Sequence, residues 1–153
     1  MPSPPELEFA FELVAQVGVP LDLGVTPRGH RRIVAVNGGR FEGPALRGRI
    51  LPGGADWQIL RADGAAELDA RYTLQTDQGA LIYVSNRGMR HGPPEVLRRL
   101  NAGEPVDPAS YYFRTVAQFE TSAPDCDWLN RSLFIGVGER YPDRVVVRFW
   151  RVQ

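Results

Sequence analysis

The segment ELDARYTLQTDQGALIYVSNRG, residues Glu67–Gly88, contains two runs of alternating side chains joined by a short polar turn. Successive side chains of a β-strand point to opposite faces, so this alternation indicates two strands, Glu67–Thr76 and Ala80–Asn86. Between them, Asp77-Gln78-Gly79 supplies the turn, with glycine where a positive φ is needed. The segment therefore predicts an antiparallel hairpin whose first strand has one polar face.

The same alternation recurs on both sides of this hairpin, interrupted each time by glycine and proline. Further strands are predicted at Leu7–Val17, Arg31–Asn37, Ala45–Leu51, Trp57–Arg61, Ser110–Glu120, Ser132–Glu139 and Arg144–Val152. A short helix is predicted to begin at Pro93-Pro94 and to end at Gly103. No composition shift, repeat or linker divides the chain, so we expect a single β-barrel domain over residues 1–153.

Regularly spaced strands with tight turns are typical of β-sandwiches and β-barrels. A long strand such as Leu7–Val17 would leave an open edge in a sandwich, and closure removes such edges. The sequence therefore predicts an all-β fold, a single antiparallel β-barrel of about eight to ten strands with one short helix.

The composition excludes several classes of function. The formal net charge is +0, which argues against a nucleic-acid partner and against a polybasic membrane anchor. The chain has no lysine, so Schiff-base chemistry and a Walker-type phosphate loop are excluded. No histidine and cysteine spacing suits zinc, and no calcium-loop spacing is present. We therefore expect no cofactor and no metal site.

The ends of the chain and its apolar content bear on location. The first residues lack a secretory signal, and no apolar run reaches the length of about 18 residues that suggests a membrane span. Cys126 is the single cysteine, so no intramolecular disulfide can form. These features predict a cytoplasmic protein, and the aromatic pair Phe149-Trp150 suggests a homodimer.

Two strands place charged residues on one face. Asp69 and Arg71 share a face of the first hairpin strand, and Arg114 and Glu120 share a face of the strand Ser110–Glu120. Either these faces meet solvent and the charges form exposed salt bridges, or they line a polar lumen that holds one ligand. In the second case, Arg71 and Arg114 would bind a carboxylate, and Asp69 and Glu120 would transfer protons.

Two loops contain further candidate site residues. Asp56 and Trp57 follow a glycine-rich turn, and Trp128 lies close to Asn130 in another loop. These tryptophans either line the mouth of a ligand cavity or plug the barrel end as core. Tyr72 would form part of the wall of the same cavity. The candidate catalytic residues are therefore Asp56, Asp69 and Glu120, and the candidate ligand-binding residues are Arg71, Arg114, Trp57, Tyr72, Trp128 and Asn130.

These segments also carry a family resemblance. The motifs in chain order are Gly38-Gly39, Phe41-x-Gly43-Pro44-x-Leu46-x-Gly48, Leu51-Pro52-Gly53-Gly54-x-Asp56-Trp57, Leu68-Asp69-x-Arg71-Tyr72, Gly79-x-x-Ile82-Tyr83-Val84, Tyr112-Phe113-Arg114-Thr115, Phe119-Glu120-Thr121 and Trp128-Leu129-Asn130. Over nearly its full length, the chain resembles the bacterial and fungal proteins of domain-of-unknown-function family 3237, also called uncharacterised protein family UPF0311. The resemblance implies a small antiparallel β-barrel and no established reaction. The family pattern has Asp-Asp-Gly where this chain has Asp77-Gln78-Gly79, which removes one acid and keeps the turn.

Two functions remain open at this point. The first is a cofactor-independent enzyme, of isomerase, lyase or hydrolase type, acting on a small carboxylated or aromatic metabolite. The second is a non-catalytic barrel that binds a small-molecule ligand with a carboxylate. Two carboxylates and an arginine that meet within hydrogen-bond reach at an open cavity would favour catalysis, and acids that are each paired with an arginine would favour binding. If the four charges Asp69, Arg71, Arg114 and Glu120 all face solvent, both hypotheses fail as built on these residues.

Overall fold

The computed structural model describes residues 1–153 and contains ten strands, one α-helix and two 3₁₀ helices. The strands are β1 (Leu7–Val17), β2 (Leu21–Thr26), β3 (Gly29–Glu42), β4 (Arg47–Ile50), β5 (Gly54–Leu60), β6 (Ala66–Thr76), β7 (Leu81–His91), β8 (Tyr112–Glu120), β9 (Phe134–Arg140) and β10 (Arg144–Val152). The helix is α1 (Pro94–Asn101), and the 3₁₀ helices are Pro108–Ser110 and Pro124–Arg131.

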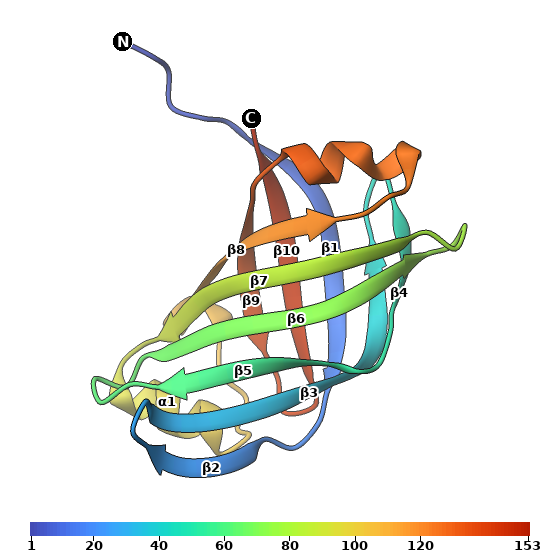
Figure 1. Ribbon diagram of the computed structural model, residues 1–153. Coiled ribbons are helices and arrows are strands. Elements are labelled where there is room, and N and C mark those ends of the chain that lie inside the picture. The colour runs from blue at the N-terminus through green and yellow to red at the C-terminus, as the bar shows by residue number, and fades with distance from the viewer.

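The strands close into an antiparallel barrel (Figure 1). Around the barrel, β1 pairs with β10, and β9, β8, β7 and β6 follow in order. The gap between β6 and β3 is filled by β4 and β5, which each pair with both neighbours, and β3 closes the ring by pairing with β1. The predicted antiparallel β-barrel with a short helix is confirmed.

One strand was missed, and two run well past their predicted ends. The missed strand is β2, where Pro20 and Gly24 suggested a break, and it pairs with β3 alone. The two longer strands are β3, which continues through Gly38 and Gly39 to Glu42 instead of ending at them, and β7, which continues beyond Asn86 to His91. At Gly39 the φ angle is +134°, and a Cβ atom there would lie 2.0 Å from the carbonyl oxygen of Val14. Glycine therefore permits the close approach of β3 to β1 that closes the barrel.

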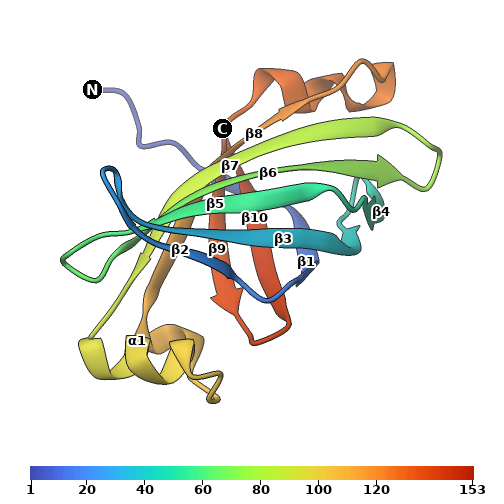
Figure 2. The same ribbon diagram turned by 60° about the horizontal axis from the view of Figure 1, so that its bottom comes forward.

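The barrel interior is divided between two ends, which carry the two longer helical segments (Figure 2). Near the 3₁₀ helix Pro124–Arg131, an apolar cluster fills the interior and includes Phe11, Phe41, Phe119, Phe134, Phe149 and Leu129. Near α1, a smaller cluster packs Leu100 of the helix on Ala66, Leu68, Tyr111 and Phe113. The first half is a packed core, and the second half leaves room for the cavity described below.

Two expectations on partners can be compared with the fold. No helix of the chain is long and apolar enough to cross a membrane. Phe149 is fully buried in the core, and Trp150 packs edge-on against Phe9 with ring centroids 5.8 Å apart. The expectation that Phe149 offers an exposed aromatic surface is therefore wrong, and the homodimer stays a prediction.

Candidate functional site

A cavity opens in the half of the barrel near α1. Its mouth lies between the segment that follows β1, with Gly18 and Pro20, and the β9–β10 turn, with Tyr141 and Pro142. The volume that the centres of water-sized molecules can occupy in this cavity is about 90 Å³. The polar lining side chains are Arg32, Asp56, Gln58, Tyr72, Asn86, Arg90, Thr115, Arg140 and Tyr141. A polar, partly enclosed space of this kind is the default location for a ligand site.

Strand alternation brings these polar side chains together from different strands. Arg32 of β3 shares its face with Val34 and Val36, and Asp56 of β5 shares its face with Gln58. On β7, Asn86 and Arg90 follow the buried Val84 in the same phase. On β8, Thr115 follows Phe113. Each strand therefore contributes polar groups to an otherwise apolar inner face.

Asp56 is held by neighbours on two sides. Gln58 Nε2 donates to Asp56 Oδ2 at 2.8 Å, and the backbone N–H of Asp69 donates to Asp56 Oδ1 at 2.9 Å. Gln58 is oriented in turn by Arg32, whose Nη2 donates to Gln58 Oε1 at 2.9 Å. Because burial disfavours the ionised form, the pKa of Asp56 is raised above its usual value, although both hydrogen bonds and the charge of Arg90 act against the shift. Asp56 is half-buried, and its side chain lines the cavity.

Arg90 is the most deeply buried charged residue of the cavity, at 4% exposed. Its guanidinium lies over the Phe113 ring, 5.5 Å from the centroid, and no carboxylate is within ion-pair distance. Burial lowers the pKa of Arg90 to about 9, helped by the nearby charges of Arg140 and Arg32. The side chain therefore remains a buried cation at neutral pH.

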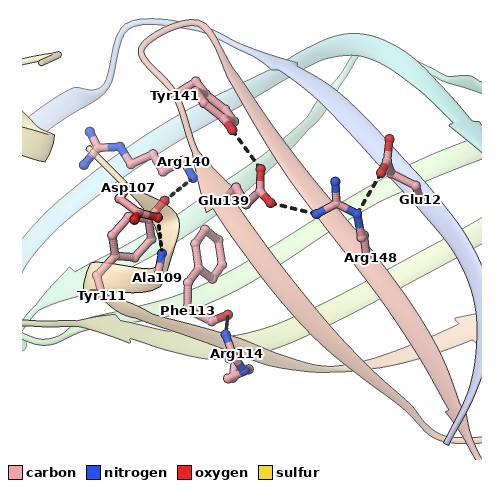
Figure 3. Close-up of polar contacts among 10 residues, drawn as sticks. All are labelled: Glu12, Asp107, Ala109, Tyr111, Phe113, Arg114, Glu139, Arg140, Tyr141 and Arg148. Atoms are coloured by element: carbon pink, nitrogen blue, oxygen red, sulfur yellow. Dashed lines mark hydrogen bonds and ion pairs between the residues drawn. The ribbon is translucent and has the colours of Figure 1, made fainter. Parts of the chain in front are cut away.

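Arg140 closes one side of the cavity. Its Nη1 donates to Asn101 Oδ1 of α1 at 2.8 Å. Figure 3 shows its backbone N–H donating to the Tyr111 hydroxyl at 2.9 Å. Burial lowers the pKa of Arg140, and the charge of Arg32 lowers it further. These contacts tie the end of β9 to α1 beside the cavity.

The mouth residue Tyr141 is anchored on the outer wall. Its hydroxyl donates to Glu139 Oε2 at 2.8 Å, and Arg148 Nη1 donates to Glu139 Oε1 at 2.7 Å (Figure 3). Arg148 Nε also pairs with Glu12 Oε2 at 2.9 Å. The hydrogen bond from Arg148 lowers the pKa of Glu139, so this carboxylate is charged at neutral pH and holds the rim of the mouth.

Three buried polar atoms in the cavity lining have no hydrogen-bond partner within the chain: Arg32 Nε, Asn86 Oδ1 and Thr115 Oγ1. Burial also raises the pKa of the Tyr72 phenol, so its hydroxyl is neutral at physiological pH. Buried polar groups in folded proteins are nearly always paired, and exceptions often mark functional sites. The cavity therefore offers hydrogen-bonding capacity that the chain itself does not use.

Two of the residues predicted from sequence, Asp56 and Tyr72, line the cavity. Asp69 and Arg71 do not, and the expectation that they form a cavity wall is wrong. Asp69 Oδ1 lies 3.5 Å from Arg71 Nε, and its Oδ2 lies 3.4 Å from Arg87 Nη2, on the outer surface. The inner face of β6 carries the apolar set Leu68, Ala70, Tyr72 and Leu74, because burial of that set outweighs burial of charges.

The charged residues of β8 also lie outside. Arg114 is exposed, its guanidinium 5.4 Å from the centroid of the Tyr112 ring, and it donates to the Phe113 carbonyl at 3.0 Å (Figure 3). Glu120 is exposed and lines a separate outer hollow beside Tyr83. The expected pocket between these residues and the first hairpin is therefore not formed, and these four charges support neither of the two functions.

The two tryptophans that were expected at the mouth of a ligand cavity do not lie there. Trp57 is exposed on the outer face of β5, opposite Ile33 of β3. Trp128 packs on Phe134 at the far end of the barrel, with ring centroids 6.0 Å apart. This tryptophan therefore fills the barrel end as part of the core, which is the second of the two arrangements expected for it. Asn130 lies at the same end. Its side-chain Oδ1 accepts a hydrogen bond from the Thr121 N–H, and its Nδ2 donates one to the Thr121 carbonyl, each at 2.9 Å.

The residues missed from sequence are Arg32, Gln58, Asn86, Arg90, Thr115 and Arg140. For most of them the signal is a polar residue in phase with the apolar face of its strand, as Arg90 is with Val84, whereas Gln58 shares its face with Asp56. No group of three His, Cys, Asp or Glu side chains converges to hold a metal ion.

Comparison with known proteins places the chain in a family. The family described as "Protein of unknown function (DUF3237)" matches residues 5–152. A UPF0311 protein of Rhodopseudomonas palustris is 45% identical over 142 residues, which is 93% of each chain. The crystal structure of the conserved protein of unknown function RPA1785 from Rhodopseudomonas palustris has a TM-score of 0.94, with 43% identity and 100% of both chains covered.

A structure described as a beta-barrel like protein from Acinetobacter baumannii has a TM-score of 0.87 and 42% identity, covering 100% of this chain and 99% of that one. A more distant relative is the hydroalkoxylation enzyme phnH of Penicillium herquei, 24% identical over 152 residues, which is 99% of this chain and 87% of that protein. On the match of nearly its whole length and the identity to its bacterial relatives, the chain belongs to the DUF3237 family, also named UPF0311.

Proposed function

We propose that the cavity binds a small carboxylated or aromatic molecule and that Asp56 transfers a proton to or from it without a cofactor. The observation that carries this proposal is the state of Asp56. Its side chain is half-buried and lines the cavity, its pKa is raised, and no arginine lies within ion-pair distance. A carboxyl group in such an environment can act as a general acid and as a general base near neutral pH.

The fixed position of Asp56 supports a catalytic role. The hydrogen bonds from Gln58 and from the Asp69 N–H orient the carboxyl before any ligand enters. General acid–base catalysis needs this positioning, because the proton donor must lie within hydrogen-bond reach of the reacting atom. Tyr72 and Asn86 line the same cavity and present a phenol and an amide to a bound molecule.

Addition or elimination is the reaction type with the most support. The Penicillium herquei relative is named a hydroalkoxylation enzyme, and hydroalkoxylation adds an O–H bond across a C=C bond. Such an addition delivers a proton to carbon and removes a proton from oxygen, and one carboxyl group can serve both transfers. At 24% identity, the relative supports the class of chemistry and leaves the substrate open. Isomerisation and hydrolysis use the same acid–base group.

A non-catalytic binding barrel is the second candidate. It is favoured by the hydrogen-bonded series from Arg32 through Gln58 to Asp56, in which the acid orients neighbouring groups. In that case Asp56 positions the ligand-binding side chains and exchanges no proton with the ligand.

Solvent deuterium incorporation distinguishes the two candidates. The protein is incubated in D₂O with 2-allylphenol, 2-prenylphenol, cinnamate and 3-hydroxybutyrate, and carbon-bound deuterium is measured by NMR and mass spectrometry. We expect incorporation into at least one probe with wild type and its loss in Asp56→Asn. Asp125→Asn, at an exposed position, is the matched control and retains incorporation. Saturable probe binding without Asp56-dependent incorporation would support the binding barrel instead.

A further inference from the structure

We infer that the ligand of this cavity is an organic acid, whose carboxylate docks on Arg90 with Arg32 and Arg140 beside it, and whose apolar body contacts the apolar walls of the cavity. This inference rests on the proposed function only in placing the reaction in the same cavity. It adds the charge of the substrate and the residues that bind the charge.

The first support is the charge balance of the lining. Three guanidinium groups line the cavity, those of Arg32, Arg90 and Arg140, and Asp56 is the one acid among the lining residues. None of the three arginines takes part in an ion pair of the chain. The cavity thus holds excess positive charge, which an anionic ligand would balance.

The second support is the contrast with arginines on the outer wall. Arg148 is half-buried and contacts two carboxylates, those of Glu12 and Glu139. Arg90 is far more buried and contacts none. A buried charge is costly unless it is paired, so the unpaired state of the deeper arginine indicates a partner that comes from outside the chain.

The third support is mutual repulsion among the three cations. The charges of Arg140 and Arg32 each lower the pKa of Arg90, so the three guanidinium groups lie within electrostatic range of one another. The fold therefore gathers like charges in a space of low dielectric, where a bound anion is attracted strongly. Guanidinium groups pair with carboxylates through two parallel hydrogen bonds, which suits a carboxylate better than a spherical anion.

The fourth support is the apolar remainder of the lining. Leu13, Val34, Leu68, Phe113 and Val147 provide the walls that an apolar body would contact. Asn86 Oδ1 and Thr115 Oγ1, both without partners, lie among these walls and can bond a hydroxyl on the body. An acid with a mainly hydrocarbon or aromatic body matches this distribution, whereas a sugar phosphate would leave the apolar walls unused.

Matched acid and amide probes test the inference. The probes are 2-naphthoate with 2-naphthamide, and benzoate with benzamide, and their binding is measured by calorimetry to wild type, Arg90→Met and Arg114→Met. Arg114 is an exposed arginine outside the cavity, so its variant controls for loss of charge. With wild type, we expect each acid to bind at least about tenfold more tightly than its amide, the order expected for charge-assisted hydrogen bonds.

In Arg90→Met, the preference for the acid should disappear while amide binding persists, and Arg114→Met should behave like wild type. Retention of amide binding shows that the variant is folded. Arg140→Gln provides a second variant and should weaken acid binding in the same direction. Equal binding of acid and amide by wild type, or an unchanged preference in both cavity variants, would overturn the inference.

The Asp56→Asn variant separates this inference from the proposed function. It should keep or strengthen the preference for the acid, because it removes the one acidic group of the lining. An acid preference without Asp56-dependent deuterium incorporation would refute the proposed catalysis alone. Incorporation that depends on Asp56, without any acid preference, would refute the anion site alone.

Discussion

Asp56 is the one acid and Arg90 the most deeply buried cation of the same cavity, and the two do not form an ion pair. Each is satisfied differently: Asp56 accepts hydrogen bonds from Gln58 and the Asp69 N–H, and Arg90 lies over the Phe113 ring. A buried charge without an opposite charge at ion-pair distance costs stability. Because they are not paired with each other, both groups are free to contact a bound molecule.

Replacing Arg90 should stabilise the unliganded protein. Arg90→Met keeps the length of the side chain and removes a buried charge without a carboxylate partner, so we expect the free energy of unfolding to rise by about 1–3 kcal/mol. Urea denaturation measures this change. Arg87→Met on the outer face of the same strand, where Arg87 lies 3.4 Å from Asp69, should change stability by less than about 0.5 kcal/mol. A less stable Arg90→Met protein would mean that the guanidinium has a structural role.

The raised pKa of Asp56 should appear in the pH dependence of stability. In the unfolded chain the carboxyl titrates near 3.8, and in the folded protein it titrates at higher pH. Between these values the unfolded state releases a proton that the folded state retains, so the free energy of unfolding falls as pH rises and then levels off above the folded pKa. Denaturation of wild type and Asp56→Asn across pH 3.8 and upward measures the difference between them. A difference that does not change with pH would contradict burial of this carboxyl.

Removing the unpaired hydroxyl of Thr115 should also stabilise the fold. Thr115→Val replaces Oγ1, which is buried without a partner, by a methyl group of similar size, and we expect a gain of about 1 kcal/mol. Thermal unfolding gives the measurement, and Thr73→Val on the outer face of β6 is the control, with a change close to zero. Loss of stability in Thr115→Val would show that the hydroxyl has a partner within the chain.

The approach of β3 to β1 should depend on glycine. Gly39→Ala would place its Cβ 2.0 Å from the Val14 carbonyl oxygen at a φ of +134°, so we expect a loss of at least about 3 kcal/mol, or failure to fold. Gly53 has a φ of +106° with no atom within 4 Å of its Cβ position, so Gly53→Ala isolates the cost of backbone strain, about 1–2 kcal/mol. Equal losses in both variants would show that the contact with β1 is not the dominant effect.

The fold was largely predictable because its signals are local. Alternation and the Asp77-Gln78-Gly79 turn predicted the β6–β7 hairpin, and the two prolines before α1 predicted the helix. The strand β2 was not predictable in the same way, because the glycine and proline around it signal turns equally well.

The site was predictable only in part because it depends on long-range register. Asp56 and Tyr72 were identified, but the sequence shows two faces of a strand and not which of them the barrel encloses. Arg90, Arg32 and Arg140 come from different strands, and barrel closure brings them together. A search for polar residues in phase with apolar neighbours would have found Arg90 and Arg32, whereas their shared cavity follows from strand pairing alone.

The division of the barrel into a packed half and a cavity half has a consequence for how the sequence can diverge. The aromatic cluster near Pro124–Arg131 holds the strands together without help from the polar lining. Substitutions of the polar lining side chains should therefore cost little stability, and some should even improve it. Tyr72 and Val147, by contrast, belong both to the lining and to the core cluster, so new ligand preferences are more readily acquired through the polar side chains than through these shared walls.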